Sequence, residues 1–313
     1  MKPDVLGLGA FPPGMMAKMT ELFSLHQFVP KDPFSPSDLS PEARARIRAI
    51  ATEAHRGASG ELIAALPKLE IVCCFGVGTD KIDLAAARAR NIPITNTPRI
   101  MADDVADLAI GLMIASSREI LPADRFAREG RWIGGSYGFT RKVSGKRLGI
   151  IGLGAIGSAI AARATAFGMA ISYSEVTPQP DLPYRFIEDP VELARNSDFL
   201  IVACQGGPST RHLVSAAVIN ALGPRGTLIN IARGSIVDEA ALIAALKEGR
   251  LGAAALDVFE VAPYIPQELL AMRNVILQPQ IAAGSIETRE AIGEMVIDSI
   301  LTRFEGRPLL NQV

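Results

Sequence analysis

Histidine is scarce in this sequence, because the 313 residues include only His26, His55 and His212. Imidazole is the side chain that changes charge near neutral pH, so the chain offers few candidates for a general acid. No group of histidines, cysteines and acidic residues has the spacing of metal ligands. We therefore expect no bound metal, and we expect any proton transfer to depend on a very small set of residues.

Cysteine and net charge are also low. The three cysteines, Cys73, Cys74 and Cys204, are odd in number and two of them adjoin in an apolar run, which is typical of reduced core thiols in a cytosolic protein. The net charge of −1 provides no basic field for nucleic acid or an anionic membrane. No secretory signal opens the chain, and the apolar stretch 148–171 contains five glycines and Arg163, which favours a strand and helix over a membrane span. These features predict a cytoplasmic protein with neither kind of partner.

Apolar runs of strand length alternate with longer helical patterns along the whole chain, which is the rhythm of parallel β-α-β units. The length suits two domains. The patterns alone put the boundary near residue 96 and leave the final helix free to pack on either domain. They predict helices over Ala102–Ser117 and Ile286–Phe304, and strands over residues 5–8, 49–52, 70–74, 93–96, 147–151, 170–173, 199–203, 227–231, 253–258 and 275–277.

A glycine-rich turn, G-x-G-x-x-G, follows the strand predicted at 147–151. In this setting Gly152 makes the tight turn, Gly154 lets the backbone approach a pyrophosphate, and Gly157 lets the helix sit close to the sheet. Ala155 and Ile156 begin the helix, whose free N–H groups and partial positive charge suit phosphates. The turn predicts a dinucleotide site; the alternative is a turn that only packs helix on strand.

Glu175 lies at the end of the next predicted strand, where an acid accepts hydrogen bonds from the adenosine ribose hydroxyls. A 2′-phosphate would meet its negative charge, and no basic residue lies between Glu175 and Asp181. The sequence therefore favours NAD over NADP, with NADH preferred over NADPH. The alternative is an ordinary exposed acid after a strand.

Two stretches further along, N-I-A-R-G-S-I-V-D at 230–238 and G-A-A-A-L-D-V-F-E at 252–260, resemble the D-isomer-specific 2-hydroxyacid dehydrogenase family. The resemblance is greatest to its glyoxylate/hydroxypyruvate and hydroxyphenylpyruvate reductases. It extends over nearly the whole chain, through F-G-V-G-T-D at 75–80, N-T-P at 96–98, residues 103–111, the glycine turn and L-Q-P at 277–279.

The resemblance implies two Rossmann-like domains with parallel sheets and a discontinuous substrate domain. The substrate domain would comprise residues 1–96 and 283–313, and the NAD-binding domain residues 97–282. The resemblance also implies a homodimer formed through the region of about 97–140, and a cleft that closes around substrate and nicotinamide. The expected partner is a small 2-keto or 2-hydroxy carboxylate.

The resemblance also implies roles for individual residues. Arg233 matches the arginine that holds the substrate carboxylate and carbonyl oxygen, a task that suits a bidentate guanidinium. Val77 and Gly78 match backbone donors to that carboxylate. Trp132 matches an aromatic position that borders substrate in some relatives; a core or dimer-interface anchor is the alternative.

The cofactor would contact further backbone and side-chain groups at the carboxyl ends of the later strands. Ile231 and Ala232, next to Arg233, match cofactor-binding positions. Asp257 matches the acid on the carboxamide side of the nicotinamide. Considered alone, an aspartate there would more often cap a helix or turn.

The sequence departs from the family at the proton donor, which is a histidine after a proline, paired with a glutamate. Here Gln280 follows Pro279, and Ala262 occupies the glutamate position. The histidine and the glutamate are both absent, which is physically consistent, because a buried glutamate without its cationic partner would carry the cost of an unpaired charge. Gln280 still offers an amide N–H to a carbonyl oxygen or alkoxide.

Three hypotheses follow. In the first, the protein is a working dehydrogenase with a relocated acid, for which His55, in the loop after the strand 49–52, is the candidate. In the second, Gln280 orients the substrate, water supplies the proton, and Glu260 assists. In the third, the chain is a non-catalytic NAD-binding protein, against which the retained Arg233 and Val77-Gly78 turn argue. We expect an NAD-dependent reductase with modified or impaired proton transfer.

Overall fold

The structure is a computed structural model that describes residues 2–29 and 34–313. The chain forms two units and passes between them twice. Unit 1 comprises residues 1–100 and 285–313, and unit 2 comprises residues 101–284. The expected domain boundaries, after residues 96 and 282, lie close to these crossings. Within the described ranges, no helix combines the length and apolar content needed to cross a membrane.

Unit 1 is built on a five-stranded parallel sheet in the order β2-β1-β3-β4-β5. Its strands are β1 (Asp4–Leu8), β2 (Ser24–Phe28), β3 (Ile47–Glu53), β4 (Ile71–Phe75) and β5 (Ile94–Thr95). The inner strand β4 is buried along its whole length, as its I-V-C-C-F sequence predicts for a strand covered on both faces. Cys73 and Cys74 are accordingly core thiols, and burial raises the pKa of Cys73 to about 12.

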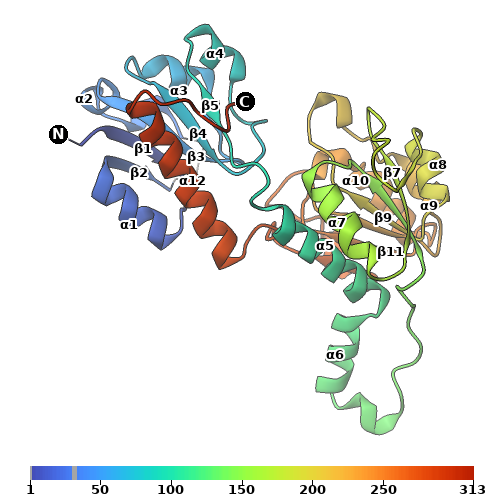
Figure 1. The fold of residues 1–313 in the computed structure, drawn as a ribbon. Coiled ribbons are helices and arrows are strands. Elements are labelled where there is room, and N and C mark those ends of the chain that lie inside the picture. Colours follow the sequence, from blue (N-terminus) through green and yellow to red (C-terminus); the bar gives the residue numbers. More distant parts are fainter. Residues whose placement is uncertain (1, 30–33) are drawn as a thin grey trace. The chain divides into compact units, whose positions relative to one another are not determined.

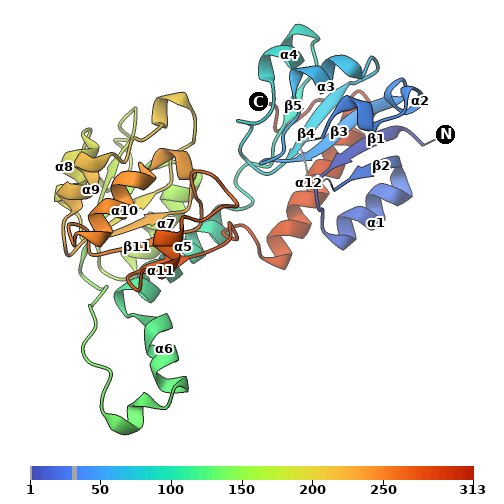
Figure 2. The same ribbon diagram turned by 180° about the vertical axis from the view of Figure 1, so that it is seen from behind.

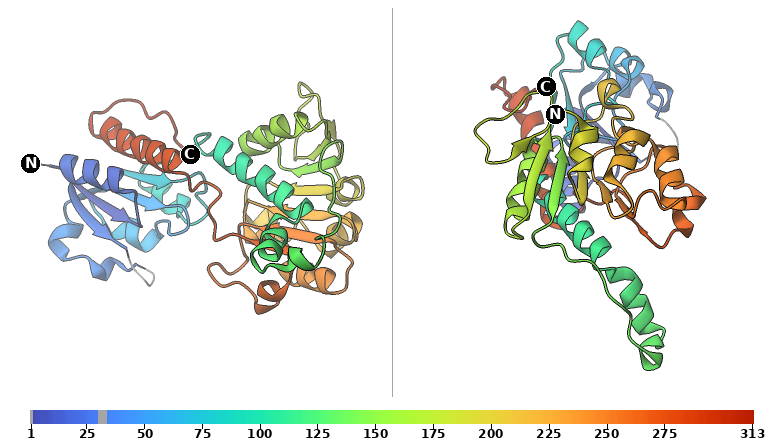
Figure 3. Two further views of the ribbon diagram at one scale, coloured as in Figure 1. Left: turned by 90° about the horizontal axis from the view of Figure 1, so that it is seen from below. Right: turned by 90° about the vertical axis from the view of Figure 1, so that its right-hand side faces the viewer.

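The helices of unit 1 cover both faces of this sheet. They are α1 (Pro13–Leu22), α2 (Pro41–Arg44), α3 (Gly60–Ala65), α4 (Leu84–Ala89) and α12 (Ile286–Phe304), with a 3₁₀ turn, η1 (Pro36–Asp38). Helix α12, red in Figure 3, packs against β4 and beside α1 on one face. It begins where the Ser285 hydroxyl accepts a hydrogen bond from the Thr288 N–H at 3.2 Å. The last helix of the chain thus completes the first unit.

Unit 2 contains a seven-stranded parallel sheet in the order β12-β11-β10-β9-β6-β7-β8, the doubly wound order of dinucleotide-binding folds. Its strands are β6 (Arg147–Ile151), β7 (Ala170–Ser174), β8 (Arg185–Phe186), β9 (Phe199–Val202), β10 (Thr227–Asn230), β11 (Ala253–Leu256) and β12 (Val275–Leu277). Together the two sheets confirm the predicted α/β class. Strands β2 and β8 were not predicted, because both are edge strands without an apolar run.

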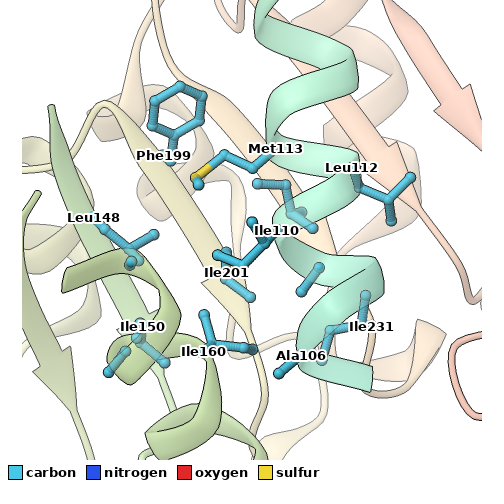
Figure 4. Packing of buried hydrophobic residues seen from close by; sticks show 14 of the residues in the cluster. Ala106, Ile110, Leu112, Met113, Leu148, Ile150, Ile160, Phe199, Ile201 and Ile231 are labelled. Atoms are coloured by element: carbon cyan, nitrogen blue, oxygen red, sulfur yellow. The ribbon is translucent and has the colours of Figure 1, made fainter. Parts of the chain in front are cut away.

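Helices enclose the sheet of unit 2 as well (Figure 2). They are α5 (Ala102–Ser117), α6 (Ile120–Arg128), α7 (Ala155–Thr165), α8 (Pro190–Arg195), α9 (Ala216–Leu222), α10 (Glu239–Lys247) and α11 (Gln267–Ala271), with 3₁₀ turns η2 (Arg131–Gly134), η3 (Pro208–Thr210) and η4 (Gly234–Ile236). Figure 4 shows how Ile110 and Met113 of α5 meet Ile160 of α7 and the strand residues Ile150 and Ile201. This core holds the strands of the unit 2 sheet in place, and the candidate site lies at the carboxyl edge of that sheet.

Helix α6 projects away from the rest of unit 2 (Figure 1), and it has no buried residue. The segment that follows it carries exposed apolar side chains, with Trp132 exposed to 73% and Ile133 to 96%. Trp132 is therefore not a core anchor within its own chain.

Candidate active site

The dinucleotide turn connects β6 to α7 at the carboxyl edge of the unit 2 sheet, where the strand order reverses between β6 and β9. Gly152 has φ +92°, and a Cβ there would lie 2.4 Å from Cα of Cys204. A Cβ on Gly157 would lie 2.1 Å from the Gly152 carbonyl oxygen, whereas Gly154 faces open space. The turn therefore combines close helix–strand packing with an accessible backbone, the shape that a pyrophosphate needs.

Cys204 packs against this turn from the end of β9. Burial raises the pKa of its thiol to about 11, and the Glu175 carboxylate adds to the shift. The thiol therefore stays protonated and unreactive at neutral pH.

Glu175 follows β7 and reaches back to the turn. Its Oε2 accepts the Leu153 N–H at 2.9 Å, and its Oε1 accepts the Val176 N–H at 3.0 Å. The Gln179 amide donates to the Leu153 carbonyl oxygen at 3.1 Å. Glu175 and Gln179 thus hold both polar groups of Leu153, in the middle of the glycine turn. The sequence prediction missed Gln179, because nothing in its local pattern indicates the contact.

Arg233 lies in the loop after β10. The buried Asn230 side chain holds this loop, since its Nδ2 donates to the Arg233 carbonyl oxygen at 3.0 Å and its Oδ1 accepts the Ala232 N–H at 3.1 Å. A Cβ on Gly206 would lie 2.6 Å from Cγ of Arg233, so the arginine side chain crosses the loop after β9. Asn230 stood in the motif that carries the family resemblance, but no role was predicted for it.

Asp257 lies at the end of β11 and is almost fully buried. Its Oδ1 accepts the Ile281 N–H at 2.8 Å, and its Oδ2 accepts the Ala282 N–H at 3.0 Å. Burial raises the pKa of this carboxyl group, and the two N–H donors partly oppose the shift. Asp257 therefore anchors the loop that presents Gln280, a role that the sequence did not predict.

Gln280 itself is exposed and has φ +57°, an uncommon conformation for a residue other than glycine. The fixed Ile281 and Ala282 amides impose this turn on the residue that precedes them. The Gln280 side chain thus projects from a backbone whose direction is set by Asp257.

Ala262 lies in the exposed turn after β11, where strand alternation no longer applies. Glu260, two residues earlier, accepts hydrogen bonds from Arg211 at 2.8 Å and from His212 at 2.9 Å. Its N–H donates to the Glu239 carboxylate at 3.2 Å, and burial raises the pKa of Glu239. Glu260 is therefore held by the loop after β9, an arrangement that argues against its assisting Gln280.

The second group of predicted residues lies in unit 1, at the carboxyl edge of its own sheet. After β4 the chain turns through Gly76 at φ +142°, and the Asn96 amide donates to the Val77 carbonyl oxygen at 2.8 Å. The N–H groups of Val77 and Gly78 make no hydrogen bond within the part of the chain that the structure describes. Two adjacent backbone donors are therefore available to an anion.

His55 follows β3 at the same edge. Its side chain is 59% exposed, and its Nε2 lies 3.8 Å from Oε2 of Glu53. The described residues contain no group of histidine, cysteine and acidic side chains that could hold a metal ion.

Comparison with known proteins places this arrangement in a family. Residues 110–282, more than half of the chain, match the model of the D-isomer specific 2-hydroxyacid dehydrogenase NAD-binding domain. The chain belongs to the D-isomer specific 2-hydroxyacid dehydrogenase family. The family resemblance predicted from the motifs is thereby confirmed, and the protein is a nicotinamide-dependent oxidoreductase.

Individual members of the 2-hydroxyacid dehydrogenase family match most of the chain. Hydroxyphenylpyruvate reductase of Plectranthus scutellarioides is 49% identical over 85% of both chains. Glyoxylate/hydroxypyruvate reductase A of Arabidopsis thaliana is 50% identical over 86% of both. The crystal structure of an NADPH-dependent glyoxylate/hydroxypyruvate reductase from Sinorhizobium meliloti, in complex with NADP and malonate, has a TM-score of 0.93 and 38% identity, covering 100% of this chain and 97% of that one.

Proposed function

We propose that this protein reduces a small 2-keto acid of the glyoxylate or hydroxypyruvate type to the 2-hydroxy acid. The observation that carries the proposal is the common edge of the unit 2 sheet. The dinucleotide turn follows β6 there, Arg233 follows β10, and the Asp257-anchored Gln280 loop follows β12. The names of two relatives support a 2-keto acid substrate, since one is a hydroxyphenylpyruvate reductase and the other a glyoxylate/hydroxypyruvate reductase.

Arg233 would hold the substrate carboxylate and carbonyl oxygen through its planar guanidinium. The N–H groups of Val77 and Gly78 would donate to the carboxylate, and their lack of hydrogen-bond partners within the described residues supports this role. When bound, the nicotinamide supplies the hydride that adds to the carbonyl carbon. The carbonyl oxygen then receives the electron pair of the broken π bond and becomes an alkoxide that needs a proton.

Gln280 would stabilise the developing negative charge by donating an amide N–H, and a water molecule would supply the proton. A glutamine cannot transfer a proton as an acid does, so we expect slow turnover with a weak dependence on pH near neutrality. His55 is the alternative donor, supported by its position at the carboxyl edge of unit 1 and its exposure. Replacing His55 by alanine separates the two, because only the His55 mechanism predicts a loss of roughly 10²-fold or more.

The cofactor would bind with its pyrophosphate on the N–H groups of Gly154, Ala155 and Ile156, and its nicotinamide near Ala232 and Asp257. Glu175 supports NADH over NADPH, because its carboxylate lies beside the turn and would repel a 2′-phosphate. In this respect the protein would differ from its Sinorhizobium meliloti relative, which is named as NADPH-dependent.

Further features support a cytoplasmic homodimer. Ile120, Leu121, Trp132, Ile133 and Phe139 are exposed apolar residues on α6 and the segment after it. Such a concentration on a projecting element is typical of a protein interface. A second copy of the chain would cover them, and Trp132 would border substrate only through that interface. The burial of Cys73 and Cys74 is compatible with the cytoplasm.

The replacement of both members of the acid pair favours a second candidate function, an NAD-binding protein without turnover. NADH fluorescence reports binding, and the loss of NADH absorbance after addition of glyoxylate or hydroxypyruvate reports turnover. Binding with turnover supports the reductase, whereas binding without turnover across a panel of 2-keto acids supports the second function.

The double variant Gln280→His, Ala262→Glu tests the proton step directly. If proton delivery limits the wild-type enzyme, the variant gains roughly 10²-fold in kcat and acquires a pH profile with an acid limb. The single variant Ala262→Glu is the control, since a glutamate without its histidine adds no proton donor. An unchanged kcat in the double variant would show that the missing pair is not limiting.

A further inference from the structure

A second cluster of charged side chains lies at the carboxyl edge of the unit 1 sheet. The order β2-β1-β3-β4-β5 reverses direction between β1 and β3, and ligands of doubly wound sheets bind where the strand order reverses. Glu53, the last residue of β3, is buried at this point, and its Oε2 accepts the Ala10 N–H from the end of β1 at 3.1 Å. The cluster therefore occupies the position in unit 1 that the dinucleotide turn occupies in unit 2.

Three cationic or basic groups surround Glu53. Arg289 lies with its guanidinium 3.5 Å from Oε1, and Arg56 lies with Nε 3.5 Å from Oε2, where His55 approaches to 3.8 Å. No other ion pair of either arginine occurs among the described residues. Two guanidinium groups share one carboxylate, so the cluster keeps an excess positive charge. The Arg56 Nε atom is buried without a hydrogen-bond partner in the described part of the chain.

Arg289 is held in place by stacking. It lies in the first turns of α12, and its guanidinium carbon is 4.3 Å from the centroid of the Phe75 ring. Phe75 is buried at the end of β4 and directly precedes the turn with the two unpartnered N–H groups of Val77 and Gly78. The stack fixes the guanidinium plane, and no guanidinium N–H of Arg289 is used in a hydrogen bond within the described residues. Its donors are therefore oriented and available beside the expected carboxylate-binding turn.

We propose that Arg289, supported by Arg56, forms a second anion subsite that binds the far carboxylate of a dicarboxylic 2-keto acid. The first carboxylate of the same substrate would lie at Val77 and Gly78. The proposal rests on the proposed reductase function and adds the substrate class, namely a 2-keto acid with a second anionic group. Glyoxylate has no such group, so its reduction does not use the subsite.

The test compares Arg289→Ala with a matched control, Arg48→Ala. Arg48 also stacks on a phenylalanine, with its guanidinium carbon 4.2 Å from the Phe304 centroid, and it also pairs with one glutamate, Glu70. Arg48 lies near the amino end of β3, whereas Glu53 lies at the carboxyl end of the same strand. Both variants therefore lose one charge, one stack and one ion pair in unit 1, but only one of them loses the proposed subsite.

The measurement is kcat/KM for oxaloacetate and for glyoxylate at constant ionic strength. We expect Arg289→Ala to lower the oxaloacetate-to-glyoxylate ratio by about 10- to 100-fold, the loss typical of a hydrogen-bonded charge pair. Arg289→Lys keeps the charge but loses the planar fork, and its ratio should lie between those of wild type and Arg289→Ala. Arg48→Ala should leave the ratio unchanged. An equal effect of Arg289→Ala on both substrates, or no effect, overturns the proposal.

A binding measurement separates this proposal from the reductase function. Calorimetric titration of the NADH-bound protein with malonate and with acetate needs no turnover. Tighter malonate binding that is lost in Arg289→Ala and retained in Arg48→Ala supports the subsite even if no 2-keto acid is reduced. Malonate affinity that is the same in all three proteins overturns the subsite even if glyoxylate is reduced normally.

Discussion

The anchoring of the Gln280 loop by Asp257 gives a quantitative prediction. Replacing Asp257 by alanine removes the acceptor of two backbone N–H groups, at 2.8 and 3.0 Å, and leaves the Ala282 donor buried and the Ile281 donor partly buried. An unsatisfied buried donor costs about 1–3 kcal/mol, and removal of a buried carboxylate returns part of that cost. We therefore expect a loss of about 2–4 kcal/mol in the free energy of unfolding of unit 2.

Hydrogen exchange and kinetics measure this loss locally. The amides of Ile281 and Ala282 should exchange faster in Asp257→Ala by roughly 30- to 1,000-fold, which corresponds to the same free energy. Because Gln280 loses its fixed backbone, kcat/KM for the 2-keto acid should fall as well. Asp198→Ala is the control, since Asp198 also accepts a backbone N–H, that of Arg147 at 3.0 Å, but precedes β9 at the other end of the sheet.

Two results would refute the reasoning. One is unchanged exchange at Ile281 and Ala282, which would mean that the carboxylate does not hold the loop. The other is an equal loss of kcat/KM in Asp198→Ala, which would mean that general destabilisation, and not the position of Gln280, lowers activity.

Asp257→Asn adds a pH test, because the pKa of Asp257 is raised by burial above its usual 3.8. The native state thus favours the protonated acid, and this contribution to stability, present at low pH, is lost as the pH rises through the raised pKa. The stability of Asp257→Asn should therefore come closer to that of wild type as the pH rises.

Three further predictions concern unit 2. Gly157→Ala places a Cβ 2.1 Å from the Gly152 carbonyl oxygen, and we expect a loss of about 1–3 kcal/mol in denaturant titrations together with weaker NADH binding. Gly111→Ala on α5, where a Cβ meets no neighbour, should leave NADH binding unchanged. Glu175→Gln should raise the NADPH-to-NADH ratio of kcat/KM roughly 10-fold or more by removing charge repulsion, and an unchanged ratio would exclude Glu175 as the selective group. The pKa of Glu239 is raised by burial and by the nearby Glu260, so its contribution to stability is lost as the pH rises; Glu239→Gln should therefore gain in thermal stability relative to wild type from acid to neutral pH.

The sequence predicted those features that depend on local pattern. The helices at 102–117 and 286–304 and the strands at 147–151 and 275–277 have the bounds that were expected, because apolar spacing and first-turn acids or caps define them. The glycine turn follows β6 and begins α7 as predicted, since Gly152 and Gly157 stand where a Cβ would clash with neighbouring atoms.

The contacts that join distant loops were not predictable in the same way. Asp257 meets the amides of Ile281 and Ala282 only because β11 and β12 are neighbours in the sheet. Arg289 reaches Glu53 only because the last helix packs on the first sheet. A single sequence carries no local signal for either contact, since each partner is an ordinary polar residue in its own segment.

The return of the chain to unit 1 also orders its folding during synthesis. Residues 101–284 form a contiguous unit whose sheet is complete before the last segment leaves the ribosome. The sheet of unit 1 is synthesised first, but one face of β4 stays uncovered until α12 arrives, together with the final residues that pair with β5. The nascent amino-terminal sheet thus exposes apolar surface while all of unit 2 is translated. A chaperone that binds exposed apolar surface would act in this period. Truncation after residue 284 should therefore leave unit 2 folded and unit 1 prone to aggregation.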